Sequence, residues 1–210
     1  MKLVIVPMKP LARAKERLSE VLTPQQRRML SLAMLEDVTR AAGALDAVWV
    51  LTSDDDAVEV ARKAGAEARP DPTPDAGLNA SLIAATDQAI AEGAQGVLIL
   101  SADCPAATAE DVLAIAIGPG VVLAPDRTGK GTNALWRSPP NAIEPSFGTG
   151  SRRAHFARAH LGGVSFAVIA RARIALDIDD PRDLETARNA PVGPATRAAL
   201  DTLGYPRHGR

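Results

Sequence analysis

The stretch from Val97 to Pro105, VLILSADCP, constrains the fold of this chain more than any other. Its four consecutive aliphatic residues, Val97–Leu100, are typical of a strand that is buried on both faces in the middle of a parallel sheet. Pro105 lacks a backbone donor, so it forces the chain out of the sheet. Asp103 is therefore expected just beyond the carboxyl end of a central strand, where open α/β sheets bind their ligands.

Asp103 has two interpretations. Its carboxylate could hold a metal ion, and a metal at this place suggests phosphate chemistry. Alternatively, it caps the next helix or closes a turn. Thr108 is better placed to cap that helix, so we favour the functional interpretation.

Strands rich in Val, Leu and Ile alternate with helices through the first 126 residues. Strands are expected at 3–7, 47–52, 67–69, 97–100 and 121–126, then at 134–137, 165–169 and 174–179. Helices are expected at 23–43, 53–64, 78–92 and 108–118. The alternation predicts a single α/β domain with a Rossmann-like, mostly parallel sheet and helices on both faces. We expect this domain to span 1–190, followed by a C-terminal extension, 191–210, that contains a short helix and is partly frayed.

Composition excludes several classes of function. The net charge of −1 gives no electrostatic reason to bind nucleic acid or an acidic membrane. A single cysteine, Cys104, excludes a disulfide framework, and the three histidines lack metal-ligand spacing. No apolar run has membrane-spanning length, and Met1-Lys2 leads into a strand without a signal peptide, so we expect a cytoplasmic protein.

Four cations, Lys9, Arg13, Lys15 and Arg17, lie within nine residues after the first strand. Cations are unfavourable near a helix N-terminus, and a bound polyanion would relieve that conflict. The alternative is a solvated basic helix start. Asn79, at the start of another helix, is either an ordinary N-cap or a contact to a base or ribose.

A second cationic segment combines glycines with a predicted helix start. Gly148 and Gly150 let backbone amides approach a ligand, and Ser151 is a natural N-cap. Arg152 and Arg153 come next, at a helix N-terminus, where anions rather than cations are favourable. A bound phosphate or carboxylate would account both for the glycines and for the two arginines. The alternative is a glycine turn with a cap. The earlier glycine-rich loop is not a P-loop, and no dinucleotide-binding fingerprint follows the first strand.

The expected late strand, Ile174–Asp179, carries two aspartates. Asp177 and Asp179 lie two residues apart, so both carboxylates would face the same side. Asp180 is the expected N-cap of the next helix and is thereby explained structurally. The other two carboxylates are unfavourable without a cation, and a shared Mg²⁺ would neutralise them together with Asp103.

Five motifs occur in order along the chain: VPMKP with AKERL (6–10 and 14–18), GLNA (77–80), SADCP (101–105), GTNA (131–134) and PSFGTGS (145–151). Together they resemble the 2-phospho-L-lactate/phosphoenolpyruvate guanylyltransferase family of coenzyme F-420 biosynthesis. That family lies within the superfamily of molybdopterin guanylyltransferases. Ser-Ala-Asp-x-Pro alone would indicate only the superfamily, whereas the joint occurrence of all five motifs is much more specific.

The resemblance implies a nucleotide-diphospho-sugar transferase-like fold and a GTP-dependent reaction. In that reaction a phosphate oxygen of a small three-carbon acid attacks the α-phosphorus of GTP, and pyrophosphate leaves. The implied acceptor is 2-phospho-L-lactate, phosphoenolpyruvate or 3-phospho-D-glycerate. The resemblance also implies Mg²⁺ as cofactor and suggests a homodimer.

The motifs assign roles to residues by resemblance. The implied catalytic residues are Asp103, Lys9 and Lys15. The implied GTP-binding residues are Pro7, Lys9, Arg13, Lys15, Arg17, Asn79 and Asp103. The implied acceptor-binding residues are Thr132, Asn133, Gly148 and Ser151, and the implied metal ligands are Asp103, Asp177 and Asp179. Two departures, Cys104 in place of an aliphatic and Asn133 in place of a hydroxyl residue, leave the acceptor preference open.

Two other functions are alternatives to this one. One is a nucleotidyltransferase for molybdopterin or a sugar phosphate, which would need a larger acceptor pocket than the compact 131–151 region suggests. The other is a non-catalytic nucleotide-binding module, against which the three aspartates speak.

Overall fold

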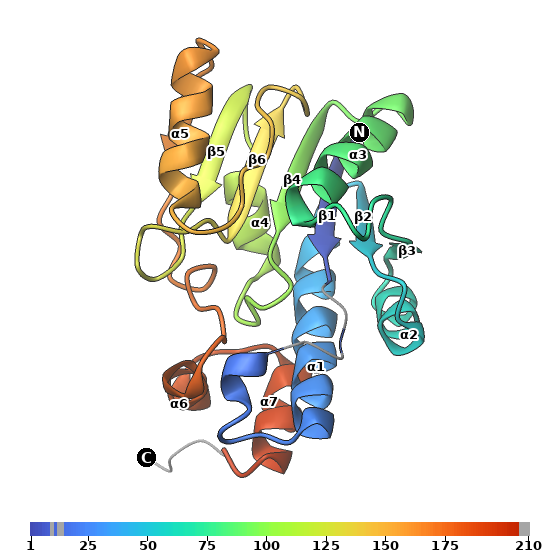
Figure 1. The fold of residues 1–210 in the computed structure, drawn as a ribbon, viewed down its shortest axis with the longest axis vertical. Helices are drawn as coiled ribbons and strands as arrows, with labels where there is room; N and C mark the ends of the chain where they lie inside the picture. Colours follow the sequence, from blue (N-terminus) through green and yellow to red (C-terminus); the bar gives the residue numbers. More distant parts are fainter. Residues whose placement is uncertain (9–10, 12–14, 206–210) are drawn as a thin grey trace.

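The computed structural model describes residues 1–8, 11 and 15–205 of the chain. Seven strands form one sheet in the order β3-β2-β1-β4-β6-β5-β7 (Figure 1). The strands are β1 (Lys2–Pro7), β2 (Ala47–Leu51), β3 (Glu67–Arg69), β4 (Gly96–Leu100), β5 (Gly120–Ala124), β6 (Ala134–Ser138) and β7 (Phe166–Val168). The helices are α1 (Pro24–Ala42), α2 (Asp55–Lys63), α3 (Leu78–Ala91), α4 (Ala109–Ile115), α5 (Ser151–Leu161), α6 (Pro181–Asn189) and α7 (Pro194–Thr202), with a 3₁₀ turn, η2 (Glu16–Leu18).

The sheet is mostly parallel, as predicted. Parallel pairs join β1 to β2 and β4, β2 to β3, and β5 to β7. Every residue of β4 is buried, because helices cover both faces of this central strand. Only β6 runs antiparallel to both of its neighbours, β4 and β5.

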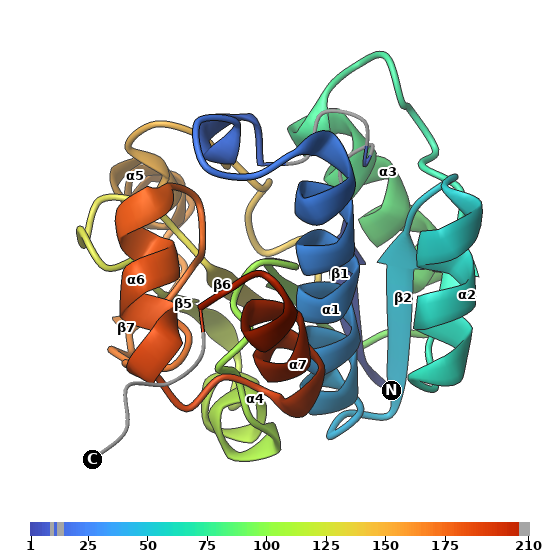
Figure 2. The same ribbon diagram turned by 90° about the horizontal axis from the view of Figure 1, so that it is seen from below.

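Helices cover both faces of the sheet (Figures 1 and 2). One hydrophobic cluster packs α1, α2 and α4 against the strands, and a second packs α3 and α5 against the opposite face. A third cluster joins η2, α1, α6 and α7 beyond the carboxyl ends of the strands. No described helix is long and apolar enough to cross a membrane.

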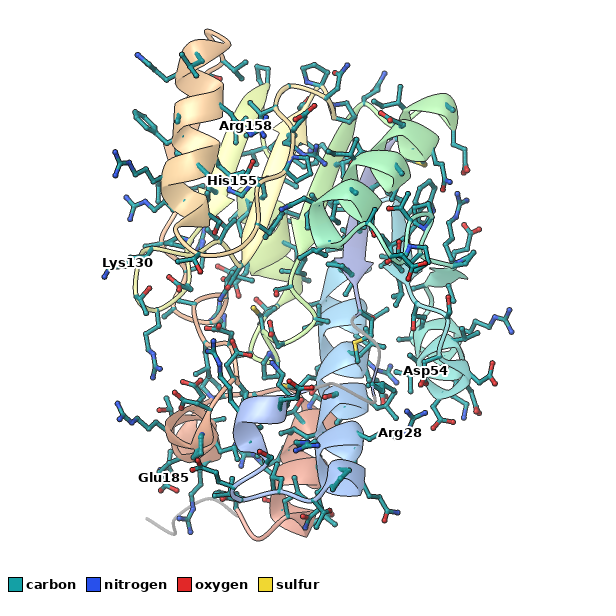
Figure 3. The ribbon with its side chains drawn as sticks, in the orientation of Figure 1. Arg28, Asp54, Lys130, His155, Arg158 and Glu185 are labelled. Atoms are coloured by element: carbon teal, nitrogen blue, oxygen red, sulfur yellow. The ribbon has the colours of Figure 1, made fainter. Side chains whose placement is uncertain are left out.

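The helix starts follow from side-chain capping in most cases. Thr23 and Gln26 form a capping box at α1, and Asp54 accepts two amide hydrogens at the start of α2. Asp180 caps α6, as predicted, with Pro181 as its first residue. Arg28 of α1 pairs with Asp54, so the cap also ties the two helices together (Figure 3).

Ser151 is not the N-cap that was expected, and of the two interpretations of Asn79 the structure excludes the N-cap. Gly77, at φ 86°, precedes α3, so Asn79 lies inside the first turn of that helix. Gly150, at φ 71°, precedes α5, so Ser151 is its first residue and is buried. Glycine adopts these positive φ angles without the steric penalty of a Cβ atom, and for this reason a glycine precedes each helix, two residues before Asn79 and one before Ser151.

The predicted strand at 174–179 is also wrong. This segment begins in a turn and pairs with no strand of the sheet, whose edge is formed by β7 instead. Its burial still alternates, since Ile174, Leu176 and Ile178 are buried while the aspartates between and after them are not. The alternation comes from packing, of Ile174 in the first cluster and of Leu176 and Ile178 in the third, rather than from a ladder of strand hydrogen bonds.

Candidate functional site

Asp103, Lys15 and Asp179 meet beyond the carboxyl end of β4. The Lys15 ammonium lies between the two carboxylates, 2.8 Å from Asp103 Oδ2 and 2.7 Å from Asp179 Oδ1. The exposed fraction of the side chain is 10% for Lys15, 25% for Asp103 and 44% for Asp179. Asp103 and Asp179 follow Lys15 by 88 and 164 residues in the chain, and the three side chains form one partly buried ion-pair cluster.

Lys15 reaches this place through an unusual backbone conformation. Its φ of 53° and ψ of 43° lie in the left-handed region, which costs a residue with a Cβ atom about 1–3 kcal/mol. The buried Leu18 of η2 anchors the turn that follows. Burial alone would lower the pKa of the Lys15 ammonium, but the carboxylates of Asp103 and Asp179 outweigh it and raise the pKa. The ammonium is therefore fixed as a cation.

Asp177 and Asp179 are brought to Asp103 by one backbone hydrogen bond, in which Ile178 N donates to Asp103 O at 3.2 Å. Burial, together with the negative charges of Asp103 and Asp179, raises the pKa of Asp177 to about 6. For Asp103, burial acts in the same direction, but the charge of Lys15 prevails and lowers the pKa. The three aspartates predicted to act together therefore lie close enough to interact.

A cavity of about 360 Å³ adjoins this cluster. Its walls come from the end of β1, from η2, from α1, from the start of α3 and from the turn after β4. The lining residues include Pro7, Lys15, Arg17, Leu78 and Asp103. Four of these, Pro7, Lys15, Arg17 and Asp103, were expected to bind GTP, and the structure brings them together. Lys9 and Arg13 lie outside the described residues.

A second, open cavity of about 1270 Å³ adjoins the first. Four cations line it, Arg17, Lys130, Arg152 and Arg153, together with the glycines of the 129–131 and 148–150 segments. Arg17 and Asp179 line both cavities, so the two meet at these side chains. The lining extends beyond the 131–151 region, to Arg17, Phe166 and Asp179.

Of the four residues expected to bind the acceptor, Gly148 lines the second cavity. Thr132, Asn133 and Ser151 are buried and engaged with other protein groups. Asn133 Nδ2 donates to Ile174 O at 2.9 Å, and Ser151 Oγ donates to Thr132 Oγ1 at 3.0 Å. Gly131 and Gly150, which precede Thr132 and Ser151 in the chain, both line the cavity.

Asn79 is paired with a peptide group. Its Oδ1 accepts from Phe147 N at 2.7 Å and its Nδ2 donates to Phe147 O at 3.0 Å. It thereby connects the start of α3, which lines the first cavity through Leu78, to the loop before α5.

Sequence reasoning missed His155, which is fully buried on α5 (Figure 3). Its Nδ1 lies 3.1 Å from Thr132 Oγ1, and its Nε2 accepts from Ser146 N at 2.8 Å. The signal was present, since His155 follows Ser151 by four residues and so shares its helix face.

A divalent cation fits the oxygen donors here. In the described part of the chain, however, no group of three His, Cys, Asp or Glu side chains is placed to hold a metal ion. Mg²⁺ is usually bound by one or two carboxylates plus substrate phosphates rather than by an all-protein cage. Asp103 and Asp179, which already share one cation in Lys15, suit that mode.

Comparisons with known proteins match this chain over most of its length. A family model described as "Guanylyl transferase CofC like" matches residues 1–198. The chain is 40% identical over 198 residues to a phosphoenolpyruvate guanylyltransferase of Sphaerobacter thermophilus, covering 91% of this chain and 95% of that protein. It is 41% identical over 187 residues to a protein of the same name from Rubrobacter xylanophilus, covering 86% and 90%.

Solved structures show the same fold. A protein of Desulfovibrio desulfuricans described as a nucleotide-diphospho-sugar transferase superposes with a TM-score of 0.75 at 16% identity, covering 99% of both chains. A CMP:2-keto-3-deoxy-manno-octonic acid synthetase complexed with CTP superposes with a TM-score of 0.53 at 13% identity, covering 89% of this chain and 96% of that one. The predicted fold class is confirmed.

Proposed function

The chain belongs to the CofC-like guanylyl transferase family, and on that premise we propose that it joins the guanylyl group of GTP to phosphoenolpyruvate, releasing pyrophosphate. The observation that carries the proposal is the pair of cavities that meet at Arg17 and Asp179, beside Asp103. Transfer between two substrates requires two sites that open onto one reacting centre. We place this reaction in coenzyme F-420 biosynthesis, and propose that a cytoplasmic homodimer carries it out.

GTP is proposed to occupy the first cavity. Lys15 and Arg17 lie where they would face the triphosphate, and Lys9 and Arg13 are proposed from the sequence to add two further cations. The guanosine is proposed to lie toward the start of α3. Because both polar atoms of the Asn79 amide are bonded to the Phe147 backbone, we propose that Asn79 fixes the start of α3 beside the guanosine.

The acceptor is proposed to occupy the second cavity. Phosphoenolpyruvate carries a phosphate and a carboxylate, and Lys130, Arg152 and Arg153 provide the matching positive charge. Gly148 and Gly150, with φ angles of 126° and 71°, line this cavity without a side chain that would fill the space before α5.

Mg²⁺ is proposed to bind between Asp103 and Asp179, with Asp177 adding negative charge nearby. Bound there, the ion would neutralise the phosphate oxygens as charge moves during transfer. The Lys15 ammonium, which lies between the same carboxylates, is proposed to turn toward the phosphates of GTP.

The reaction needs little covalent work from the protein. The acceptor phosphate is already an anion, so no general base is required for its oxygen to attack the α-phosphorus. Lys15 and Arg17 would stabilise charge on the transferring group, and the two cavities would hold attacking and leaving groups on opposite sides of it. No described residue has to exchange a proton in this scheme.

Incubation with GTP, Mg²⁺ and one acceptor at a time tests the proposal through pyrophosphate release and the mass of the product. The expected result is a guanylylated product with phosphoenolpyruvate, and slower or no product with 2-phospho-L-lactate and 3-phospho-D-glycerate. A sugar 1-phosphate belongs in the panel because the second cavity is wide. Product from the sugar phosphate and from no three-carbon acid would contradict the proposal.

A further inference from the structure

His155 joins the two glycine-bearing walls of the second cavity. Through Nδ1 it contacts Thr132, which follows Gly131 in one wall. Through Nε2 it accepts from Ser146 N, at the start of the loop that carries Gly148 and Gly150 in the other wall. One imidazole therefore touches both sides of the space in which the acceptor is proposed to bind.

The hydrogen bonds define which ring nitrogen carries the proton. A backbone amide can only donate, so Nε2 accepts with its lone pair, and the proton of the neutral ring lies on Nδ1. Nδ1–H then donates to Thr132 Oγ1, which also accepts from Ser151 Oγ. Both lone pairs of the Thr132 hydroxyl are thereby used by residues of α5.

Further contacts hold the loop against this ring. The Phe147 ring packs edge-on against His155, with centroids 5.2 Å apart and an interplanar angle of 73°. The peptide of Phe147 is held from the other side by Asn79. Arg158, one turn further along α5, donates to Ser146 Oγ at 2.6 Å (Figure 3).

Resting on the proposed function, we propose that His155 is a positioning residue for the acceptor site: it sets the distance between the Gly131 wall and the Gly148–Gly150 wall. It touches neither substrate. A shift of about 1 Å in such a wall is enough to weaken a phosphate site strongly. GTP binds in the other cavity, whose lining does not include these walls.

Three substitutions separate the two hydrogen bonds. His155→Gln places an acceptor near the Nε2 position and loses the Thr132 contact, whereas His155→Asn keeps a donor near Nδ1 and loses the Ser146 contact. His155→Ala loses both. Ala157→Ser, at an exposed position on the same helix, is the control.

Steady-state kinetics in both substrates test the proposal. We expect His155→Ala to raise KM for phosphoenolpyruvate about 10-fold or more, with KM for GTP within about twofold of wild type. The Gln and Asn variants should each recover part of the loss. A merely structural role would lower the active fraction, and hence kcat, while leaving both KM values unchanged, and that result would overturn the proposal.

Two outcomes separate this inference from the proposed function. If the wild-type protein forms no guanylylated three-carbon acid, the proposed function fails. If wild type is active but every folded His155 variant retains the wild-type KM for phosphoenolpyruvate, only the positioning role fails. If His155→Ala does not fold, the KM for phosphoenolpyruvate of the Gln and Asn variants is compared with that of wild type instead.

Discussion

At the scale of single residues, the site depends on Lys15. Its ammonium neutralises Asp103 and Asp179, and its left-handed backbone is a strain that the surrounding contacts maintain. The sequence placed Asp103, Lys15 and Arg17 correctly near the ends of β4 and β1, because strand ends are visible in hydrophobic patterning. It could not show that Lys15 pairs with these aspartates, since that contact joins residues far apart in the chain.

Replacing Asp103 removes the charge at the centre of the site. We expect Asp103→Asn to lower kcat by about 10³-fold or more, because the amide cannot hold a cation or anchor Lys15 as the carboxylate does. The same change at Asp55, exposed on α2, should leave turnover unchanged. Pyrophosphate release measures turnover, and a melting curve checks that both variants fold. Near-normal turnover in Asp103→Asn would refute its role.

The backbone strain at Lys15 can be measured by comparing Ala and Gly. At φ 53° a Cβ atom is unfavourable, so Lys15→Gly should be more stable than Lys15→Ala by up to about 1 kcal/mol. At Arg62, an exposed helical position, the order should reverse, with Gly less stable by about 1 kcal/mol. Urea unfolding gives the four values. The same order at both positions would mean that Lys15 carries no strain.

His155 makes stability depend on pH. Burial, with the nearby charges of Arg137 and Arg158, lowers its pKa from 6.5 to about 4. Between pH 6.5 and about pH 4, His155 is protonated in the unfolded chain but neutral in the folded protein. The free energy of unfolding therefore falls as the pH falls through this window. The loss amounts to at most about 3 kcal/mol. Urea unfolding at pH 7.5 and 4.5 should show a smaller loss in His155→Gln than in wild type. Equal losses would contradict this assignment.

At the scale of elements, the strands and helices follow from local sequence, but their attachments do not. Thr108 and Asp180 were recognisable caps because each lies directly before its helix. Asp37 was not, since it lies in the middle of α1. Its carboxylate accepts from Ala195 N at 3.1 Å and Thr196 N at 2.7 Å, and so caps α7 from a distance of more than 150 residues along the chain.

Removing this distant cap should loosen α7. Asp37→Ala leaves two amide hydrogens at a buried helix start without their acceptor, so we expect a loss of about 2 kcal/mol in the free energy of unfolding. The neighbouring Glu36→Ala loses only a surface pair with Arg40 and should cost about 0.5 kcal/mol or less. Chemical denaturation compares the two, and equal losses would show that Asp37 does not hold α7.

At the scale of the whole molecule, the sheet was predictable as an α/β, mostly parallel layer, but its strand order was not. The connection from β5 to β6 is too short for a crossover, which is consistent with an antiparallel pair. That β6 inserts between β4 and β5 depends on long-range pairing that no local pattern encodes. This insertion brings Thr132 and Asn133 to the end of β4, where Ser101 N donates to Asn133 O, and thus sets the second cavity beside the first.

The central claim is that the two cavities together form one transfer site, and phosphorus NMR of the reaction mixture tests it most directly. With GTP, Mg²⁺ and phosphoenolpyruvate, we predict two mutually coupled phosphorus signals from a new diphosphate bridge, together with one equivalent of free pyrophosphate. GDP with inorganic phosphate, GMP with pyrophosphate but no new bridge, or unchanged GTP would contradict the account.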